Sequence, residues 1–180
     1  MKPSIFPEMF ETARLRLRPP AIDDAKIIFD AYAQDPDVTR YLVWLPHPSV
    51  ETTEHFISYC AERWTAKTAF SYVITKLGDG ELLGMIEIQL RQHGATIGYV
   101  LAKKHWRQGI MAEAAGCLVK YALRQPAIFR VQAFCDVENI ASARTLEKIG
   151  MSREGILRRY IVHPSMSGEP RDCYLYAITR

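Results

Sequence analysis

The sequence predicts an α/β fold, in the broad sense that includes α+β, in which helices cover a mixed β-sheet. Three observations support this prediction: segments of period-two alternation, segments of helical periodicity between some of them, and short glycine-containing loops between others. Strands joined through helices can run parallel, whereas strands joined by hairpin loops run antiparallel. The 180 residues are close to the usual size of one domain, so we expect a single domain over residues 1–180.

The first elements are a strand and a helix. Residues 14–18 alternate arginine with leucine and are followed by two prolines, which predicts a strand with one apolar face. A helix is expected next, because Asp23 or Asp24 can cap it and apolar residues recur at helical spacing. It should end at the Asp35-Pro36 break.

A second helix and a hairpin are expected in the middle of the chain. Ser49 is expected to open the helix, since a stripe of apolar and small residues follows at helical spacing and should lie in the core. Residues 70–76 and 81–90 have strand character, and Gly78-Asp79-Gly80 joins them as a hairpin-type loop. The members of the helix stripe are Thr53, Phe56, Ile57, Cys60 and Trp64.

The second half of the chain alternates strands and helices. After a turn at His93-Gly94, the expected strands cover residues 97–101, 129–136, 151–162 and 172–179, and the expected helices cover residues 109–123 and 139–149. Strand 129–136 should place Phe129, Val131, Ala133 and Cys135 on one side. Gly150 fits the residue after a helix end.

Composition excludes several classes of protein. The net charge of +3 is small and dispersed, which argues against a nucleic-acid-binding protein. The four cysteines, which form neither a Cys-x-x-Cys pair nor a metal pattern with histidine, are expected to be reduced thiols, and no metal site is expected. Residues 1–11 lack the apolar region of a signal peptide, and no run approaches the ~18 apolar residues of a membrane span. We therefore expect a cytoplasmic protein without membrane or nucleic-acid partners, either a monomer or a homodimer.

The most informative segment is His105-Trp106-Arg107-Gln108-Gly109-Ile110-Met111-Ala112-Glu113-Ala114, which connects a strand to the start of a helix. The first turn of a helix leaves about four N–H groups without partners and carries about half a positive charge, so it suits a phosphate or pyrophosphate. Gly109 lets such a ligand lie against the backbone and permits a positive φ.

Further motifs accompany this segment. Ile97-Gly98-Tyr99 precedes it and Glu113-Ala114 lies within it. Asn139, Ser142 and Glu147-Lys148-Ile149-Gly150 follow it in that order. Together with Trp106 and Gly109, these motifs resemble the GNAT superfamily of acyl-CoA-dependent N-acyltransferases. Within it the chain is most similar to the ribosomal-protein alanine N-acetyltransferase (RimJ/RimL-like) branch. The resemblance covers most of the chain, from Thr12 to Asp172.

The resemblance implies a mostly antiparallel sheet with a splayed strand pair that forms the acyl-CoA cleft. It implies acetyl-CoA as co-substrate and a primary amine as acceptor, with direct attack of the amine on the thioester in a ternary complex. The pantetheine arm would pair with the backbone of Tyr99, Val100 and Leu101. The pyrophosphate would lie on the N–H groups of residues 107–112, and Asn139 and Ser142 would lie beside the thioester. The loop residues concerned are Arg107, Gln108, Gly109, Ile110, Met111 and Ala112.

Acyl transfer from a thioester needs a donor for the departing thiol and a base for the amine. The resemblance assigns the donor to Ser142, although Asn139 can be a helix N-cap with Ser142 as its third helical residue. Many family members carry a tyrosine donor where this chain has Leu146, which leaves Ser142 or a water. Glu87 is the candidate base, because it interrupts an apolar strand, on the face of Leu83 and Met85. It can equally be an exposed polar residue of a half-buried sheet.

Other residues carry alternative interpretations. Trp106 is expected to pack rather than to bind ligand, Glu113 can simply favour the helix dipole, and Arg107 can be a solvated cation. Met111 is bulkier than the small residue usual in the family and can narrow the approach to the phosphates. His105 and His93 are weaker candidates for the base and are expected to face solvent.

The acceptor is the least defined part of the sequence. In the suggested branch, Tyr41, Trp44 and Tyr160 would line its site, although these aromatics can also be core residues. A protein N-terminal α-amine, an aminoglycoside-like amine, a polyamine or an amino acid all stay open. A non-catalytic CoA- or nucleotide-binding module is the alternative function, whereas the motifs of serine hydrolases and P-loop ATPases are absent from the sequence.

Overall fold

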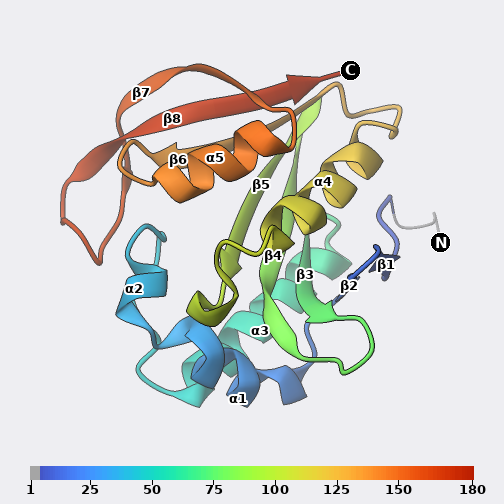
Figure 1. Cartoon of the computed structure of the whole chain (residues 1–180), viewed down its shortest axis with the longest axis vertical. Coiled ribbons are helices and arrows are strands. Elements are labelled where there is room, and N and C mark those ends of the chain that lie inside the picture. Colours follow the sequence, from blue (N-terminus) through green and yellow to red (C-terminus); the bar gives the residue numbers. More distant parts are fainter. Residues whose placement is uncertain (1–4) are drawn as a thin grey trace.

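The computed structural model describes residues 5–180 and contains one eight-stranded sheet. The strand order is β1-β2-β3-β4-β5-β6-β8-β7, and every pair is antiparallel except β5 with β6 (Figure 1). The strands are β1 (Phe10–Glu11), β2 (Leu15–Arg18), β3 (Ala69–Lys76), β4 (Leu82–Arg91), β5 (Gly94–Leu101), β6 (Arg130–Asp136), β7 (Ser152–Val162) and β8 (Pro170–Thr179). The predicted mixed, mostly antiparallel sheet is confirmed.

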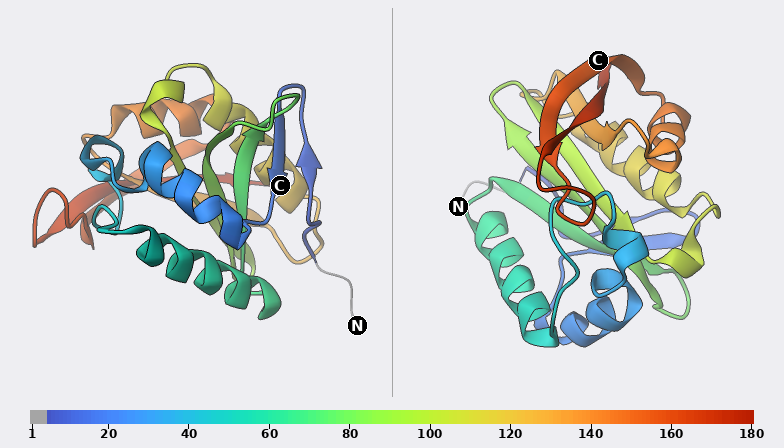
Figure 2. Two further views of the ribbon diagram at one scale, coloured as in Figure 1. Left: turned by 90° about the horizontal axis from the view of Figure 1, so that it is seen from below. Right: turned by 90° about the vertical axis from the view of Figure 1, so that its left-hand side faces the viewer.

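Helices cover both faces of this sheet, as Figure 2 shows. Helices α4 (Ile110–Ala122) and α5 (Ile140–Lys148) close one face over the larger core, which includes Leu118, Leu146 and Tyr176. Helices α1 (Ala25–Ile28) and α3 (Val50–Thr65) close the other over a smaller core. The remaining turns are 3₁₀ segments Ile22–Asp24 and Lys103–His105, a π-helical turn Phe29–Ala33, and α2 (Pro36–Thr39). None of the helices in this described part is long and apolar enough to cross a bilayer.

The parallel pair β5/β6 separates part of the way along its length. Pairing begins with Gly94 opposite Arg130 and ends with Thr96 opposite Gln132. Beyond that point β5 runs on to Leu101 beside β4, and β6 runs on to Asp136 beside β8. The predicted splayed strand pair is therefore present, and the backbone edges of β5 and β6 face each other without pairing.

The helices around residues 22–39 differ from the prediction. Asp24 holds the N-cap position of α1, but its carboxylate makes no bond to that helix; it accepts hydrogen bonds from Arg18 and from the Ala21 N–H that precedes the 3₁₀ segment, the latter at 2.7 Å. The Asp35-Pro36 pair opens a helix instead of only ending one: Asp35 accepts from the Asp37 N–H at 2.8 Å, and Pro36 takes the first helical position. Proline suits that position because its missing N–H would have no partner there.

Two strands also differ in detail. A bulge in β4 puts Thr75 opposite Leu82 but Ile74 opposite Gly84, so Leu83 is an extra residue. It packs with Ile86 in the larger core, and the prediction that Leu83 shares the face of Met85 and Glu87 was wrong. In β6 the apolar side holds Val131, Ala133 and Cys135 as predicted, whereas Phe129 precedes the strand and is exposed.

Candidate active site

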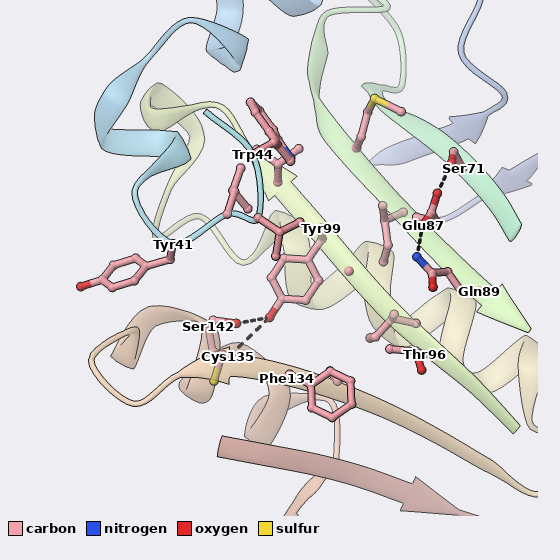
Figure 3. A pocket seen from close by; sticks show the side chains of 18 of the residues that line it. Tyr41, Trp44, Ser71, Glu87, Gln89, Thr96, Tyr99, Phe134, Cys135 and Ser142 are labelled. Carbon is pink, nitrogen blue, oxygen red and sulfur yellow. Dashed lines mark hydrogen bonds between the residues drawn. The ribbon is translucent and has the colours of Figure 1, made fainter. Parts of the chain in front are cut away.

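A cavity of about 590 Å³ passes through the gap between β5 and β6. Figure 3 shows side chains from β3, β4 and β5 on one side of it and from β6 and α5 on the other. Its lining joins aromatic rings with a small polar set, which is the usual composition of a small-molecule site. The aromatic residues are Tyr32, Tyr41, Trp44, Phe56, Tyr59, Tyr99, Phe134 and Tyr160, and the polar and charged ones include Arg63, Ser71, Glu87, Gln89, Asn139 and Ser142.

Ser142 lies where the two strands diverge, on the first turn of α5. Its hydroxyl is 2.8 Å from the Tyr99 hydroxyl, and its N–H donates to the Asn139 side chain at 3.1 Å. Asn139 is therefore the N-cap of α5, as the local interpretation of the sequence predicted. Burial raises the pKa of Tyr99, so its hydroxyl stays protonated and can donate to Ser142. From the sequence we predicted a role for the Tyr99 backbone only, and the contact of its hydroxyl with Ser142 was missed.

Glu87 lies in the cavity wall at the centre of a polar network. Arg63 donates from Nη1 to both carboxylate oxygens, at 3.0 and 2.9 Å. Ser71 donates at 2.7 Å and Gln89 at 2.7 Å. Because a carboxylate offers about four lone-pair positions, these four bonds occupy its accepting capacity. Glu87 can take a proton from an amine or a water only after one of the donors moves.

The start of α4 has the features of an anion site. Gly109 is the N-cap with φ +74°, no side chain among the described residues caps the helix, and Arg107 is also left-handed at φ +62°. A second cavity of about 410 Å³ lies against this turn. A Cβ at Gly109 would be 3.6 Å from Lys148 Nζ and 3.8 Å from Arg14 Nη2. Two cations and the positive helix end therefore meet at one point.

Arg14 and Lys148 were not predicted as site residues. Arg14 was assigned only to a strand, and Lys148 only to a motif near a helix end. Their cationic side chains were the available signal, but the sequence does not reveal that the start of β2 and the end of α5 both lie beside α4. Lys148 also stands in the last turn of α5, where a cation favours the helix dipole.

Glu113 connects Thr12 and Arg14 to the first turn of α4. Its carboxylate accepts from Thr12 Oγ1 at 2.6 Å, from the Arg14 N–H at 3.0 Å and from Arg14 Nε at 2.6 Å. Burial alone would raise the pKa of this carboxyl, but the hydrogen bonds from Thr12 and Arg14 outweigh it and lower the pKa. Arg14 also donates to the Gln108 carbonyl at 3.2 Å. Glu113 thus orients a cation toward the helix start.

Other residues of the loop have structural positions. The Trp106 indole N–H donates to the Leu101 carbonyl at 2.8 Å, which fixes the loop to the end of β5 although the ring is 42% exposed. Ile110 and Met111 are buried in the larger core. The expectation that Met111 narrows the approach to the phosphates was therefore wrong, because its side chain points inward and only its backbone faces the turn.

Three further expectations concerned side chains near the site. His105 is buried, with Nε2 3.4 Å from Glu81 Oε1, so the expectation that it faces solvent was wrong. It does not line the cavity between β5 and β6, whereas His93 is exposed as expected. Leu146, at the position of the family's tyrosine, is fully buried in the core, and Ser142 is the α5 hydroxyl that lines the cavity.

The outer part of the cavity is formed by the aromatic residues predicted for the acceptor. Tyr41 donates to the Glu138 carbonyl at 3.5 Å, and the rings of Phe134 and Tyr160 lie 4.8 Å apart. Tyr41 is half-buried and Tyr160 is exposed, whereas Trp44 is half-buried, lines the cavity and also packs against the smaller core.

An ion pair between buried Asp136 and partly exposed Arg171 lies at the ends of the strands beside this part of the cavity. Asp136 is fully buried and accepts from Arg171 Nε at 2.7 Å, and His163 Nε2 lies 3.7 Å from the same carboxylate. On its other side, His163 Nδ1 is 3.3 Å from the Leu42 carbonyl. These contacts hold the loop before α3 against the ends of β6 and β8.

The chain is similar to acetyltransferases in sequence and in structure. A family model described as the acetyltransferase (GNAT) domain matches residues 14–152. The uncharacterized N-acetyltransferase YoaA of Bacillus subtilis (strain 168) is 32% identical over 179 residues, 98% of each chain. A GNAT-family acetyltransferase from Bacillus anthracis is 30% identical, with a TM-score of 0.82 over 95% of this chain and 98% of that one.

A ribosomal protein uS5 alanine N-acetyltransferase from Escherichia coli (strain K12) is 30% identical over 87 residues, 48% of this chain and 43% of that one. The order of motifs from Tyr99 to Gly150 had indicated the same relationship. The chain belongs to the GNAT acetyltransferase family and is an acyl-CoA-dependent N-acetyltransferase.

Proposed function

We propose that the protein transfers an acetyl group from acetyl-CoA to a primary amine, by direct attack of the amine on the thioester in a ternary complex. A protein N-terminal α-amine, the acceptor of the uS5 alanine N-acetyltransferase, is one candidate. The observation that carries the proposal is the cavity through the β5/β6 gap, because it gives an acceptor on one side access to a thioester held from the other.

The residues around the gap fit acetyl-CoA. The pyrophosphate would lie against the N–H groups of residues 107–112, with Arg14 and Lys148 close by. The pantetheine amides would pair with the unpaired edge of β5 at Tyr99 and Val100. At Leu101 the carbonyl already accepts from Trp106, so this residue offers the ligand less than its neighbours do.

The reaction forms a bond between the amine nitrogen and the acetyl carbon and breaks the bond between that carbon and sulfur. In our proposal Ser142 donates its hydroxyl proton to the departing thiolate and regains one from water, while the Tyr99 hydroxyl donates a hydrogen bond to the Ser142 oxygen. The amine proton passes to an ordered water. Glu87 can hold that water once one of its three donor residues moves aside, and otherwise it orients Arg63. Placing amine and thioester together supplies much of the rate.

Two measurements test this function. Calorimetry should detect acetyl-CoA binding at tens of micromolar or below, and thiol release should follow with at least one acceptor from a panel of amines, amino acids and N-terminal peptides. Binding without thiol release on any acceptor would instead indicate the CoA-binding module.

The variant Ser142→Ala tests the proposed donor. It should lower kcat by about 10²-fold or more while changing the Kd for acetyl-CoA little. The control Thr145→Ala removes a hydroxyl from the same helix that donates only to the Ala141 carbonyl, and it should keep full turnover. Equal losses of turnover and affinity in Ser142→Ala would assign Ser142 to cofactor contact or capping.

A further inference from the structure

We propose that Arg63 binds a carboxylate that the acceptor carries beside its amine, which makes the acceptor a free amino acid with an apolar or aromatic side chain. This inference rests on the proposed function and names its substrate class. It depends on three observations: the unused donors of Arg63, the charge of the cavity, and the space beside Gly98.

Arg63 is held in place with part of its guanidinium available. It lies on the last turn of α3 over the Tyr59 ring, at 5.2 Å from the ring centroid, and its side chain is 20% exposed. Both bonds to Glu87 come from Nη1, and no group of residues 5–180 accepts a hydrogen bond from Nε or Nη2. The guanidinium lines the cavity, so these two donors can bind a carboxylate.

The charge of the cavity favours an acceptor with an anionic group. Glu87 supplies the only carboxylate among the described residues that line it, whereas Arg63 and Arg91 supply two cations. Glu87 is already paired with Arg63. A polyamine or an aminoglycoside would bring several positive charges into a site that cannot neutralise them. A carboxylate would balance the excess.

The space for the amine lies beside Glu87. Gly98 is the cross-strand partner of Glu87, just past the last β5/β6 pair at Thr96, and nothing lies within 4 Å of the point where its Cβ would stand. An amino acid anchored at Arg63 can reach the gap over this glycine. Its side chain would then face the aromatic lining around Trp44 and Phe134 (Figure 3). Burial of an apolar side chain among such rings is favourable.

The experiment compares phenylalanine, phenylalaninamide, phenethylamine and a peptide with N-terminal phenylalanine as acceptors for the whole protein with acetyl-CoA. We expect kcat/KM for phenylalanine to exceed that for the amide and the amine by about 10-fold to 100-fold, the effect of one or two hydrogen bonds to a charged group. The amine of phenylalaninamide is less basic and more easily deprotonated, so this preference cannot come from the acidity of the ammonium group.

Variants of Arg63 complete the test. Arg63→Gln should remove the preference for phenylalanine over its amide and raise KM rather than lower kcat, and Arg63→Lys should keep part of the preference. Arg124→Gln is the matched control, since it removes an exposed cation that does not line the cavity and should keep the preference. Acetyl-CoA affinity, measured on every variant, reports whether the fold is intact.

The outcomes separate this inference from the proposed function. Equal turnover of phenylalanine and its amide, preferred turnover of the peptide, or a preference that survives in Arg63→Gln would overturn the role of Arg63 and leave the proposed function standing. Failure of every amine in the panel, with acetyl-CoA bound, would overturn both.

Discussion

Replacement of Gly109 by alanine separates backbone strain from ligand binding at the start of α4. The residue has φ +74°, and an L-residue in this left-handed region costs about 1–2 kcal/mol. The new methyl group would meet only Lys148 Nζ at 3.6 Å and Arg14 Nη2 at 3.8 Å, which are ordinary contacts. For a chain of this size the strain should lower Tm by about 2–8 °C.

The effect on acetyl-CoA should be larger than the strain explains. A phosphate that touches both the helix N–H groups and the two cations must pass through the position of that methyl group. Loss of one hydrogen bond to a charged group costs about 1.5–3 kcal/mol, so the Kd for acetyl-CoA should rise by about 10-fold to 100-fold. Calorimetry gives the Kd, and thermal unfolding without ligand gives the strain.

Gly80→Ala is the control, because Gly80 has the same φ of +74° in the loop between β3 and β4 and nothing lies within 4 Å of its Cβ position. It should lower Tm by a similar amount and leave the Kd unchanged. An unchanged Kd in Gly109→Ala, or an equal change in both variants, would refute the assignment of the helix start to the pyrophosphate.

Three further predictions follow from the described contacts. Gly98→Val should fill the space beside Glu87, so acceptor kcat/KM should fall at least about 10-fold in steady-state assays while acetyl-CoA binding persists; unaltered acceptor kinetics would contradict the position of the acceptor. Glu113→Gln should free Arg14 and raise the Kd for acetyl-CoA about 3-fold to 10-fold by calorimetry, and an unaffected Kd would show that Arg14 needs no such support. Asp136→Asn should lower the free energy of unfolding by about 1.5–3 kcal/mol in denaturant unfolding, because Arg171 loses its charge-assisted hydrogen bonds to a fully buried carboxylate but keeps Glu138 as a partner. Burial raises the pKa of Asp136, but the hydrogen bonds from Arg171 lower it by more, so the net shift of the pKa is downward. The stability that this pair contributes is present above the unfolded pKa of about 3.9 and is lost as pH falls through the lower folded pKa. The variant should not show this loss of stability in acid.

The sequence predicted the long elements well because their periodicity follows from burial. Helix α3 begins after Ser49, and its stripe holds Thr53, Ile57 and Cys60 in the interior as expected. The exceptions came from interactions between distant segments or from irregular backbone. Asp24 has Arg18 as its partner, and the extra residue Leu83 reverses the alternation of β4, neither of which a local pattern reveals.

The site was predictable in its backbone and less so in its side chains. Gly109, with its positive φ, follows from the need for a helix start open to a ligand. The partners of that turn are Arg14, which immediately precedes β2, and Lys148, which ends α5, and only the fold brings them together. In the same way Glu87 was found because a carboxylate is unusual in an apolar strand, but its ion pair with Arg63 depends on how α3 crosses the sheet.

The separation of β5 from β6 also has a consequence for folding. Beyond Thr96 and Gln132 main-chain donors and acceptors on the facing edges of the two strands have no strand partner, although the Leu101 carbonyl accepts from Trp106. In our proposal an extended ligand with amide groups pairs with the edge of β5. Such a ligand is bound by the folded chain and not by the unfolded one, so at 100 times its Kd it adds about 2.7 kcal/mol to the free energy of unfolding. The free energy of unfolding would then rise with the concentration of acyl-CoA.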